Sequence, residues 1–128
     1  MKILVIDDER GSHEVALGIY DKDLIISAYN GEEGINAIEE EDPDVILLDI
    51  TMPIISGEEL LKHFKKNKKV LRKIIIITGS ADGICLASKY GASGSIWKPF
   101  NRKQLKEVIQ RVLNGRDKKE KSFEVYNK

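Results

Sequence analysis

Short apolar runs recur along the chain at a steady interval, and each is followed by a stretch with helical character. The runs are Ile3–Ile6, Leu24–Ala28, Val45–Leu48, Ile74–Ile77 and Ser95–Trp97. Several are rich in β-branched residues and apolar at nearly every position, which is typical of strands buried on both faces of a parallel sheet. The pattern therefore predicts five parallel strands with helices between them.

The segments between the runs carry signals of helix starts. Asn30 with Glu33 and Ser56 with Glu59 have the spacing of capping boxes, and Asn101 can cap a last helix. The apolar stripe of that last helix consists of Leu105, Val108, Ile109, Val112 and Leu113. Strand and helix alternate five times, and crossovers between parallel strands are right-handed, so we expect an α/β three-layer sandwich of the (βα)5 type.

Length and composition indicate one globular domain. The 128 residues and the hydrophobic fraction of 41% suffice for a single core. We expect this domain to cover residues 1–115. The basic segment 116–128 lacks periodicity and is expected to be a flexible tail, with no output domain.

The charges exclude some classes of function. The chain has 21 basic and 21 acidic residues, and this zero net charge argues against direct binding of nucleic acid. Acidic residues outnumber basic ones by 17 to 11 in residues 1–97, whereas basic residues prevail by 10 to 4 in residues 98–128. The first apolar run ends in Asp7-Asp8-Glu9 and is too short for a signal peptide or a membrane span. We expect a cytoplasmic protein that does not insert into membranes.

Three residues with reactive side chains belong to no recognisable catalytic or metal-binding motif. Cys85 is the one cysteine, which excludes an intrachain disulfide, and we expect it to be a small packing residue. His13 and His63 have no metal-ligand spacing and are expected at the surface.

Polar residues stand at the carboxyl ends of the predicted strands. The first run ends in Asp7-Asp8, the third in Asp49, the fourth in Thr78 and the fifth in Lys98. Because ligands bind at this edge of open parallel sheets, we expect these side chains to converge there. Clustered carboxylates suit a hard divalent cation such as Mg²⁺. Acids, a cation and a lysine together favour phosphoryl transfer, with an aspartate as the nucleophile.

The order of these motifs resembles a known family. The pieces that match are Leu4-Val5-Ile6-Asp7-Asp8-Glu9, Asn30-Gly31-Glu32-Glu33, Asp44-Val45-Ile46-Leu47-Leu48-Asp49, Met52-Pro53 with Ser56-Gly57, Thr78-Gly79, Gly91-Ala92 and Lys98-Pro99-Phe100. As a set they resemble the receiver domain of response regulators in two-component signalling, from Lys2 to about Leu113. The resemblance implies a flavodoxin-like fold with a five-stranded parallel sheet of order 2-1-3-4-5.

The resemblance also implies a metal site and a phosphoacceptor. Asp49 would accept the phosphoryl group. Asp8 and Asp49 would ligate Mg²⁺, or Mn²⁺ in its place, together with the backbone carbonyl of Thr51. Asp7 would act mainly through water.

Lys98 and Thr78 would then contact the phosphoryl group. By resemblance, Lys98 pairs with phosphoryl oxygens and Thr78 swings in to donate a hydrogen bond to one of them. The family also implies a cis peptide between Lys98 and Pro99, which an X-Pro bond permits at a cost of roughly 0.5–1 kcal/mol.

One position departs from the family pattern. Most receivers have an aromatic residue three positions before the lysine, which fills the space that the threonine leaves, and here that residue is Ser95. Trp97 should share a sheet face with Ser95. Our hypothesis is that Trp97, or Tyr90 of the preceding helix, partly replaces the missing aromatic; the alternative is a plain packing role for Trp97.

These features predict a stand-alone signalling receiver and not a metabolic enzyme. It would take a phosphoryl group from a histidine kinase or a histidine phosphotransfer protein, change conformation, and act on a downstream protein as a monomer or a phosphorylation-dependent dimer. The alternatives are a small phosphatase, which needs a substrate pocket or cap, and a degenerate receiver that only binds partners. A flavodoxin-like FMN carrier is the third, although Asp7-Asp8-Glu9 would repel its phosphate.

Overall fold

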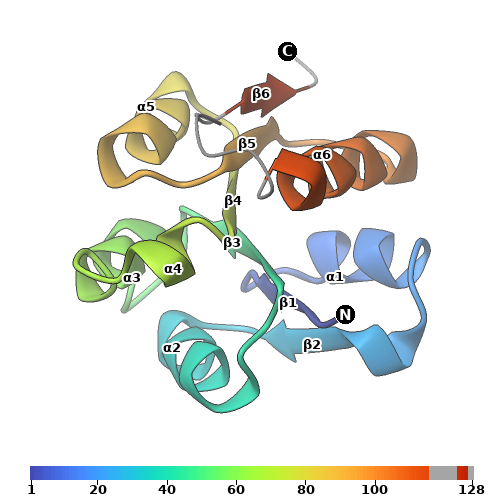
Figure 1. Ribbon diagram of the computed structural model, residues 1–128, viewed down its shortest axis with the longest axis horizontal. Helices are drawn as coiled ribbons and strands as arrows, with labels where there is room; N and C mark the ends of the chain where they lie inside the picture. Colours follow the sequence, from blue (N-terminus) through green and yellow to red (C-terminus); the bar gives the residue numbers. More distant parts are fainter. Residues whose placement is uncertain (116–123, 127–128) are drawn as a thin grey trace.

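The computed structural model describes residues 1–115 and 124–126 (Figure 1). Its strands are β1 (Ile3–Ile6), β2 (Ile25–Ala28), β3 (Val45–Asp49), β4 (Ile74–Thr78), β5 (Gly94–Trp97) and β6 (Glu124–Tyr126). Its α-helices are α1 (Arg10–Leu17), α2 (Gly31–Glu41), α3 (Gly57–His63), α4 (Lys68–Leu71), α5 (Ala81–Tyr90) and α6 (Arg102–Gly115), with a 3-10 turn at Lys22–Leu24. All five predicted strands are present, each with bounds within one residue of its apolar run.

The strands form one parallel sheet between two layers of helices. The order is β2-β1-β3-β4-β5-β6, which confirms the predicted order 2-1-3-4-5. Helices α2, α3, α4 and α5 cover one face and α1 and α6 the other (Figure 1). The chain runs from β1 outward to β2 and then returns to β3 on the other side of β1. Ligand sites in such sheets form at the carboxyl ends of the two strands that flank this reversal.

The sheet of the described residues has one strand more than the five predicted. β6 pairs in parallel with β5, and Gly94, Ser95 and Ile96 stand opposite Glu124, Val125 and Tyr126. A strand of three residues is too short to produce a hydrophobic pattern, so the sequence does not reveal it. The other residues of the predicted flexible tail, 116–123 and 127–128, lie outside the described residues.

The predicted helix starts are capped by side chains. At α3, Ser56 and Glu59 form a complete capping box with hydrogen bonds of 3.2 Å in both directions. At α2, the Asn30 carboxamide oxygen accepts the N–H of Glu33 at 2.8 Å. The carboxamide of Asn101 accepts a backbone N–H three residues further on at 2.9 Å and so caps α6. None of the described helices has the length and apolarity that a membrane crossing requires.

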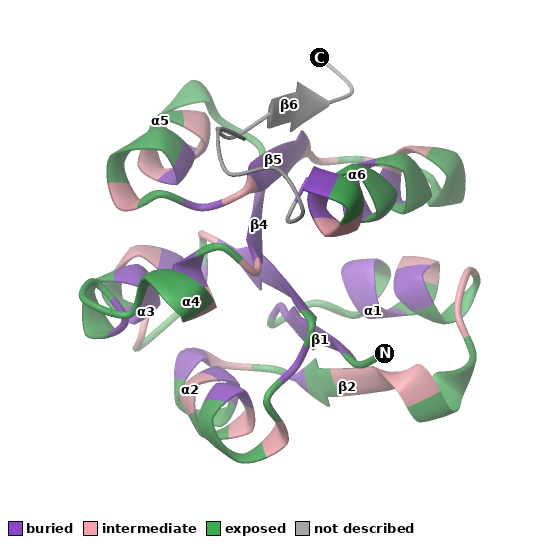
Figure 2. Ribbon diagram, in the orientation of Figure 1, coloured by how far each residue is buried: buried purple, intermediate pink, exposed green. Residues whose placement is uncertain are grey.

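Each face of the sheet has its own hydrophobic core. Figure 2 shows that the central strands between the two helix layers are buried. Successive residues of the central strands point to opposite faces and are fully buried, so both cores draw on the same strands. The core under α2, α3 and α5 includes Leu4, Ile6, Ile46, Leu48, Ile74 and Ile76. The core under α1 and α6 includes Ile3, Val5, Val45, Leu47, Ile75, Ile77 and Ile96, with Leu105, Val108, Ile109 and Val112 of the predicted α6 stripe.

Two of the isolated reactive residues lie elsewhere than predicted. His13 is buried, with 2% exposed, and not at the surface. Its Nε2 lies 2.9 Å from the Asp7 carbonyl oxygen, its Nδ1 lies 3.0 Å from the Ser27 hydroxyl, and its ring stacks on Tyr29. Buried partners can satisfy a polar side chain on the inner face of a helix, which a hydrophobic pattern does not reveal. Cys85 is exposed and not a packing residue, whereas His63 is exposed as predicted.

Ile54, in the loop between β3 and α3, combines two unfavourable features. Its φ of 68° lies in the left-handed region, where a β-branched side chain is strained. Its side chain is also 93% exposed, so burial does not offset the strain.

Replacing Ile54 by Asn should therefore stabilise the fold. Asn adopts left-handed backbone more readily, and hardly any buried surface is lost. We expect the free energy of unfolding to rise by about 1 kcal/mol and Tm by roughly 4 °C. Urea unfolding followed by Trp97 fluorescence measures the change. Ile54→Val keeps the branched Cβ and serves as the control; an Asn variant no more stable than the Val variant would contradict the strain.

Candidate functional site

The carboxyl end of the sheet brings three aspartates together. Asp7 and Asp8 follow β1, and Asp49 ends the adjacent strand β3. One carboxylate oxygen of each lies within 4.8 Å of the others. Asp7 and Asp49 are buried, with 0% and 3% exposed, whereas Asp8 is exposed. The three acids predicted to converge from the strand ends thus lie at one place, and two of them are removed from water.

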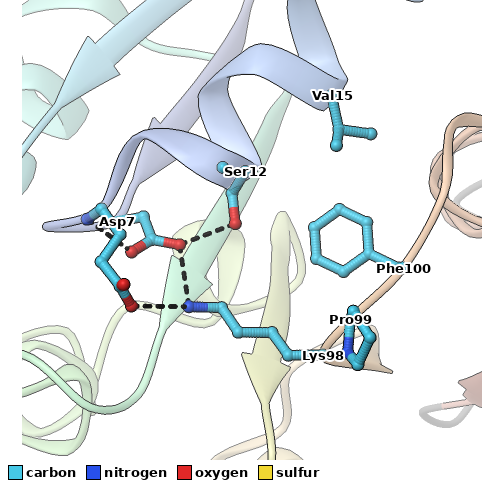
Figure 3. Close-up of a pocket in the computed structure, with 8 residues that line it drawn as sticks. Asp7, Ser12, Val15, Lys98, Pro99 and Phe100 are labelled. Carbon is cyan, nitrogen blue, oxygen red and sulfur yellow. Dashed lines mark hydrogen bonds and ion pairs between the residues drawn. The ribbon is translucent and has the colours of Figure 1, made fainter.

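Lys98 reaches into this cluster from the end of β5 (Figure 3). Its Nζ lies 3.1 Å from Asp7 Oδ2, 3.5 Å from Asp49 Oδ2 and 3.9 Å from Glu9 Oε1. The Lys98-Pro99 peptide is cis, as predicted. The ammonium therefore stands between the two buried carboxylates and offsets part of their charge.

Asp7 is held by groups from the start of α1. Its Oδ2 accepts a hydrogen bond of 2.6 Å from the Ser12 hydroxyl, and its Oδ1 accepts the Glu9 N–H at 3.0 Å (Figure 3). The His13 ring holds its backbone carbonyl. Sequence reasoning missed Ser12 and His13. Both lie in the first turn of α1, and the local sequence pattern does not indicate that this turn faces the acids.

The buried charges shift the pKa values of all three central groups. Burial and the neighbouring charge of Asp7 raise the pKa of Asp49 to about 7, although Lys98 and the Thr51 N–H oppose this. Burial would also raise the pKa of Asp7, but the Ser12 hydroxyl, the Glu9 N–H and Lys98 outweigh it and lower that pKa. Burial lowers the pKa of Lys98, yet Asp49 and Asp7 raise it overall. Without a metal ion, Asp49 is therefore the more basic of the two buried carboxylates.

Thr78 lies beside this cluster at the end of β4, with 4% exposed. Its hydroxyl donates to the Ser80 carbonyl oxygen at 3.0 Å and accepts the Ser80 N–H at 3.0 Å. Thr51, on the other side, is exposed and donates its N–H to Asp49 Oδ1 at 3.2 Å. The Thr78 hydroxyl thus lies at the strand end where it was predicted, and its hydrogen bonds are to Ser80 in the turn that follows β4.

The residues of the predicted switch lie on the α5 side of the sheet. Ile96 belongs to the opposite core, so Ser95 and Trp97 share the face toward α5, as expected. Trp97 stands in register with Thr78 on the adjacent strand. The Tyr90 hydroxyl donates to Glu58 of α3 at 3.2 Å and so links α5 with α3.

A pocket of about 430 Å³ adjoins the charged cluster between α1 and the segment that follows β5. Figure 3 shows Val15, Pro99 and Phe100 along its apolar side, away from the carboxylates. Asp7, Glu9, Ser12 and Lys98 form its polar end. The pocket thus has an apolar side and a charged end.

The sequence profile of the response regulator receiver domain family matches residues 3–110. The chain is 30% identical over 115 residues to sporulation initiation phosphotransferase F of Bacillus subtilis, covering 88% of this chain and 93% of the relative. It is 29% identical over 133 aligned positions to the alkaline phosphatase synthesis transcriptional regulatory protein PhoP of the same organism, covering 98% and 54%. The chain spans about half the length of the first curated relatives that it matches.

Solved structures agree with the profile. A CheY-like response regulator receiver domain protein from Methanospirillum hungatei superimposes with a TM-score of 0.79 at 30% identity, covering 91% of this chain and 96% of the other. Chemotaxis protein CheY4 of Vibrio cholerae gives a TM-score of 0.75 at 26% identity, covering 87% and 97%. The parallel sheet and the acidic edge define a receiver. This chain belongs to the response regulator receiver domain family, the signal-receiving modules of two-component systems.

The raised pKa of Asp49 predicts how stability depends on pH. The folded protein holds a proton on Asp49 that the unfolded chain releases near pH 4, so this stabilising contribution is lost as the pH rises towards 7. Above pH 7 the ionised carboxylate opposes folding. In metal-free buffer Asp49→Asn should therefore be more stable than the wild type at pH 8, by on the order of 1 kcal/mol, and less so at pH 5.

Thermal unfolding at the two pH values tests this expectation. Glu39→Gln, which removes an exposed carboxylate from α2, is the matched control and should change stability little at either pH. An equal gain for Asp49→Asn at pH 5 and pH 8 would show that the burial of charge is not its cause.

Proposed function

We propose that this receiver is a phosphorylation switch in which Asp49 accepts a phosphoryl group from a phosphohistidine. The donor would be a histidine kinase or a histidine phosphotransfer protein, and the phosphorylated form would bind a downstream protein differently. The observation that carries the proposal is the buried Asp49 carboxylate, which lies 3.5 Å from the Lys98 ammonium and within reach of two further acids.

The acidic cluster fits a Mg²⁺ ion, with Mn²⁺ as a substitute. Three carboxylate oxygens within 4.8 Å are hard donors of the kind that Mg²⁺ prefers. Asp8 and Asp49 would hold the ion with the backbone carbonyl of Thr51. Asp7 would act mainly through water, because both of its oxygens already accept hydrogen bonds from protein groups. When bound, the cation neutralises negative charge at the phosphoryl oxygens.

The transfer itself needs an ionised Asp49 and a fixed positive charge. An Asp49 carboxylate oxygen forms the new O–P bond while the N–P bond of the phosphohistidine breaks. The donor imidazole keeps the electron pair of that bond and takes up a proton. Lys98 is held by Asp7 and Asp49 at the place where the phosphoryl oxygens arrive, so its ammonium can stabilise their charge without moving far.

The pocket beside Lys98 supports an approach of the donor from the side of α1. Val15 and Phe100 give this pocket an apolar wall, and its polar end includes Lys98 and Asp7. A donor protein could pack against the wall while its phosphohistidine reaches Asp49.

The effect of phosphorylation would be transmitted to partners through Thr78. The phosphoryl oxygens offer new acceptors near Asp49, so the Thr78 hydroxyl would exchange its bonds with Ser80 for one to the phosphoryl group. The elements next to Thr78 are β5, where Trp97 stands in register, and α5. We expect the surface of α5, β5 and α6 to contact the downstream partner.

Acetyl phosphate tests the proposal directly. Incubation with Mg²⁺ should add one phosphoryl group to the intact protein, because Asp49 is a carboxylate nucleophile beside the positive charge of Lys98. Intact mass spectrometry measures the adduct. Asp49→Asn and an incubation with EDTA should each abolish it, while Glu39→Gln should phosphorylate like the wild type. A protein that gains no phosphoryl group with Mg²⁺ present would favour an interaction module without phosphorylation.

The affinity for Mg²⁺ should depend on pH. The cation competes with the proton on Asp49, so the association constant should rise about tenfold per pH unit below pH 7 and level off above it. Isothermal titration calorimetry between pH 6 and pH 8.5 measures this dependence. Asp8→Asn should weaken binding by about tenfold or more at every pH while leaving the slope unchanged. A pH-independent affinity would show that Asp49 does not hold a proton in this range and would contradict its raised pKa.

A further inference from the structure

The first turn of α5 lies directly against the side chain of Thr78. Only Gly79 and Ser80 separate the end of β4 from the start of α5. Gly83, in this first turn, is buried. A Cβ atom at Gly83 would stand 3.0 Å from Thr78 Cγ2 and closer still to Thr78 Oγ1 and Cβ, well inside van der Waals contact. Thr78 therefore occupies the space that any other residue at position 83 would fill.

Gly83 is required here because it has no side chain, and not because its backbone adopts a conformation that only glycine favours. The glycine with positive φ among the described residues is Gly91, at the end of α5, whereas Gly83 lies inside the helix. Glycine is a weaker helix former than alanine. Gly83 therefore lowers the stability of α5 in the turn that meets Thr78.

Hydrogen bonds hold Thr78 in this position. Its hydroxyl donates to the Ser80 carbonyl and accepts the Ser80 N–H, each at 3.0 Å. Ser80 in turn caps α5, with its hydroxyl 3.4 Å from the Gly83 N–H. Ser80 and Gly83 together form what we term the Thr78 seat. A movement of Thr78 towards Asp49 would break both bonds to Ser80 and empty the space at Gly83, so the first turn of α5 would lose its contact with the Thr78 side chain.

The position on β5 that holds an aromatic residue in most receivers is occupied here by a small residue, Ser95. Ser95 is fully buried, and its hydroxyl has no hydrogen-bond partner among the described residues. A serine side chain is too small to fill a space that a threonine leaves. The contact of Thr78 with α5 is therefore the more direct link between the acidic cluster and the helix.

We propose that Gly83 seats Thr78 in the unphosphorylated state by leaving free the space that the Thr78 side chain occupies, and that position 83 thereby sets how readily Thr78 moves towards Asp49. The inference rests on the proposed function, because the phosphoryl group on Asp49 is what draws Thr78 away. It assigns to Gly83 the role of a positioning residue, which acts on the switch through Thr78 and does not touch the phosphoryl group.

The wild-type protein provides the first test. A nuclear Overhauser effect between the Thr78 methyl group and the Gly83 α-protons should be strong in the Mg²⁺-bound, unphosphorylated protein. Beryllofluoride, a phosphoryl mimic, should abolish it and shift the amide resonances of residues 80–84. An effect that persists at full strength with beryllofluoride bound would overturn the seat.

Gly83→Ala provides the second test. The added methyl group should expel Thr78, so the amide resonances of α5 in the unphosphorylated variant should move at least halfway along the line from the free to the beryllofluoride-bound wild type. Phosphorylation by acetyl phosphate should be several-fold faster, because part of the conformational change has already occurred. Resonances that stay at their wild-type positions, or leave that line, would contradict the proposal.

Ser88→Ala is the matched control for Gly83→Ala. Ser88 is exposed on the same helix, so its replacement raises helix propensity without adding a contact at Thr78. It should leave both the resonances along that line and the phosphorylation rate unchanged. If Gly83→Ala does not fold, the effect measured in the wild type decides.

The two levels of inference fail in different ways. A wild-type protein that binds neither a phosphoryl group nor beryllofluoride, by intact mass and by fluorine resonance, overturns the proposed function and the seat with it. A protein that takes up either group but keeps Thr78 against Gly83 overturns the seat alone and leaves the phosphorylation switch in place.

Discussion

The site depends on an imbalance of charge away from water. Two carboxylates, Asp7 and Asp49, are buried beside a single ammonium, that of Lys98. Removing charges from water is unfavourable unless they are paired, and here one negative charge exceeds the supply. The proton that relieves this excess is held by Asp49, because Ser12 and the Glu9 N–H stabilise the ionised form of Asp7. The ionised form of Asp49 is therefore the one that a bound cation would stabilise most.

The sheet topology makes this arrangement affordable for the fold. β1 and β3 are neighbours although a full strand and two helices separate them in sequence, and their ends place Asp7 and Asp49 side by side. Both strands are anchored by two hydrophobic cores, one on each face of the sheet. The stability of the central strands can therefore offset an acidic edge that is unfavourable on its own. The same anchoring fixes the positions of the strand ends that carry Asp7 and Asp49.

Much of this could be predicted from sequence, for identifiable reasons. Strands such as Ile74–Thr78 are apolar at almost every position, so their burial and their order at the site edge follow from pattern and family resemblance. The contacts of Ser12 and His13 could not be predicted, since a polar residue in a first helical turn gives no sign of whether it faces water. The strained backbone of Ile54 and the closeness of Gly83 to Thr78 depend on three-dimensional placement that no local pattern encodes.

The sixth strand also has a consequence for how the chain meets other molecules. Without β6, the outer side of β5 would present a row of unpaired backbone N–H and C=O groups over Gly94–Ile96. Such an edge is a template on which strands of neighbouring chains assemble, and proteins commonly cover it. Residues 124–126 pair with this edge, so the outer strand on this side of the described sheet is β6, which has three residues. A very short edge strand offers few unpaired groups to neighbouring chains. We expect a fragment that stops at the end of α6 to leave the backbone of β5 open to such pairing and to aggregate more readily.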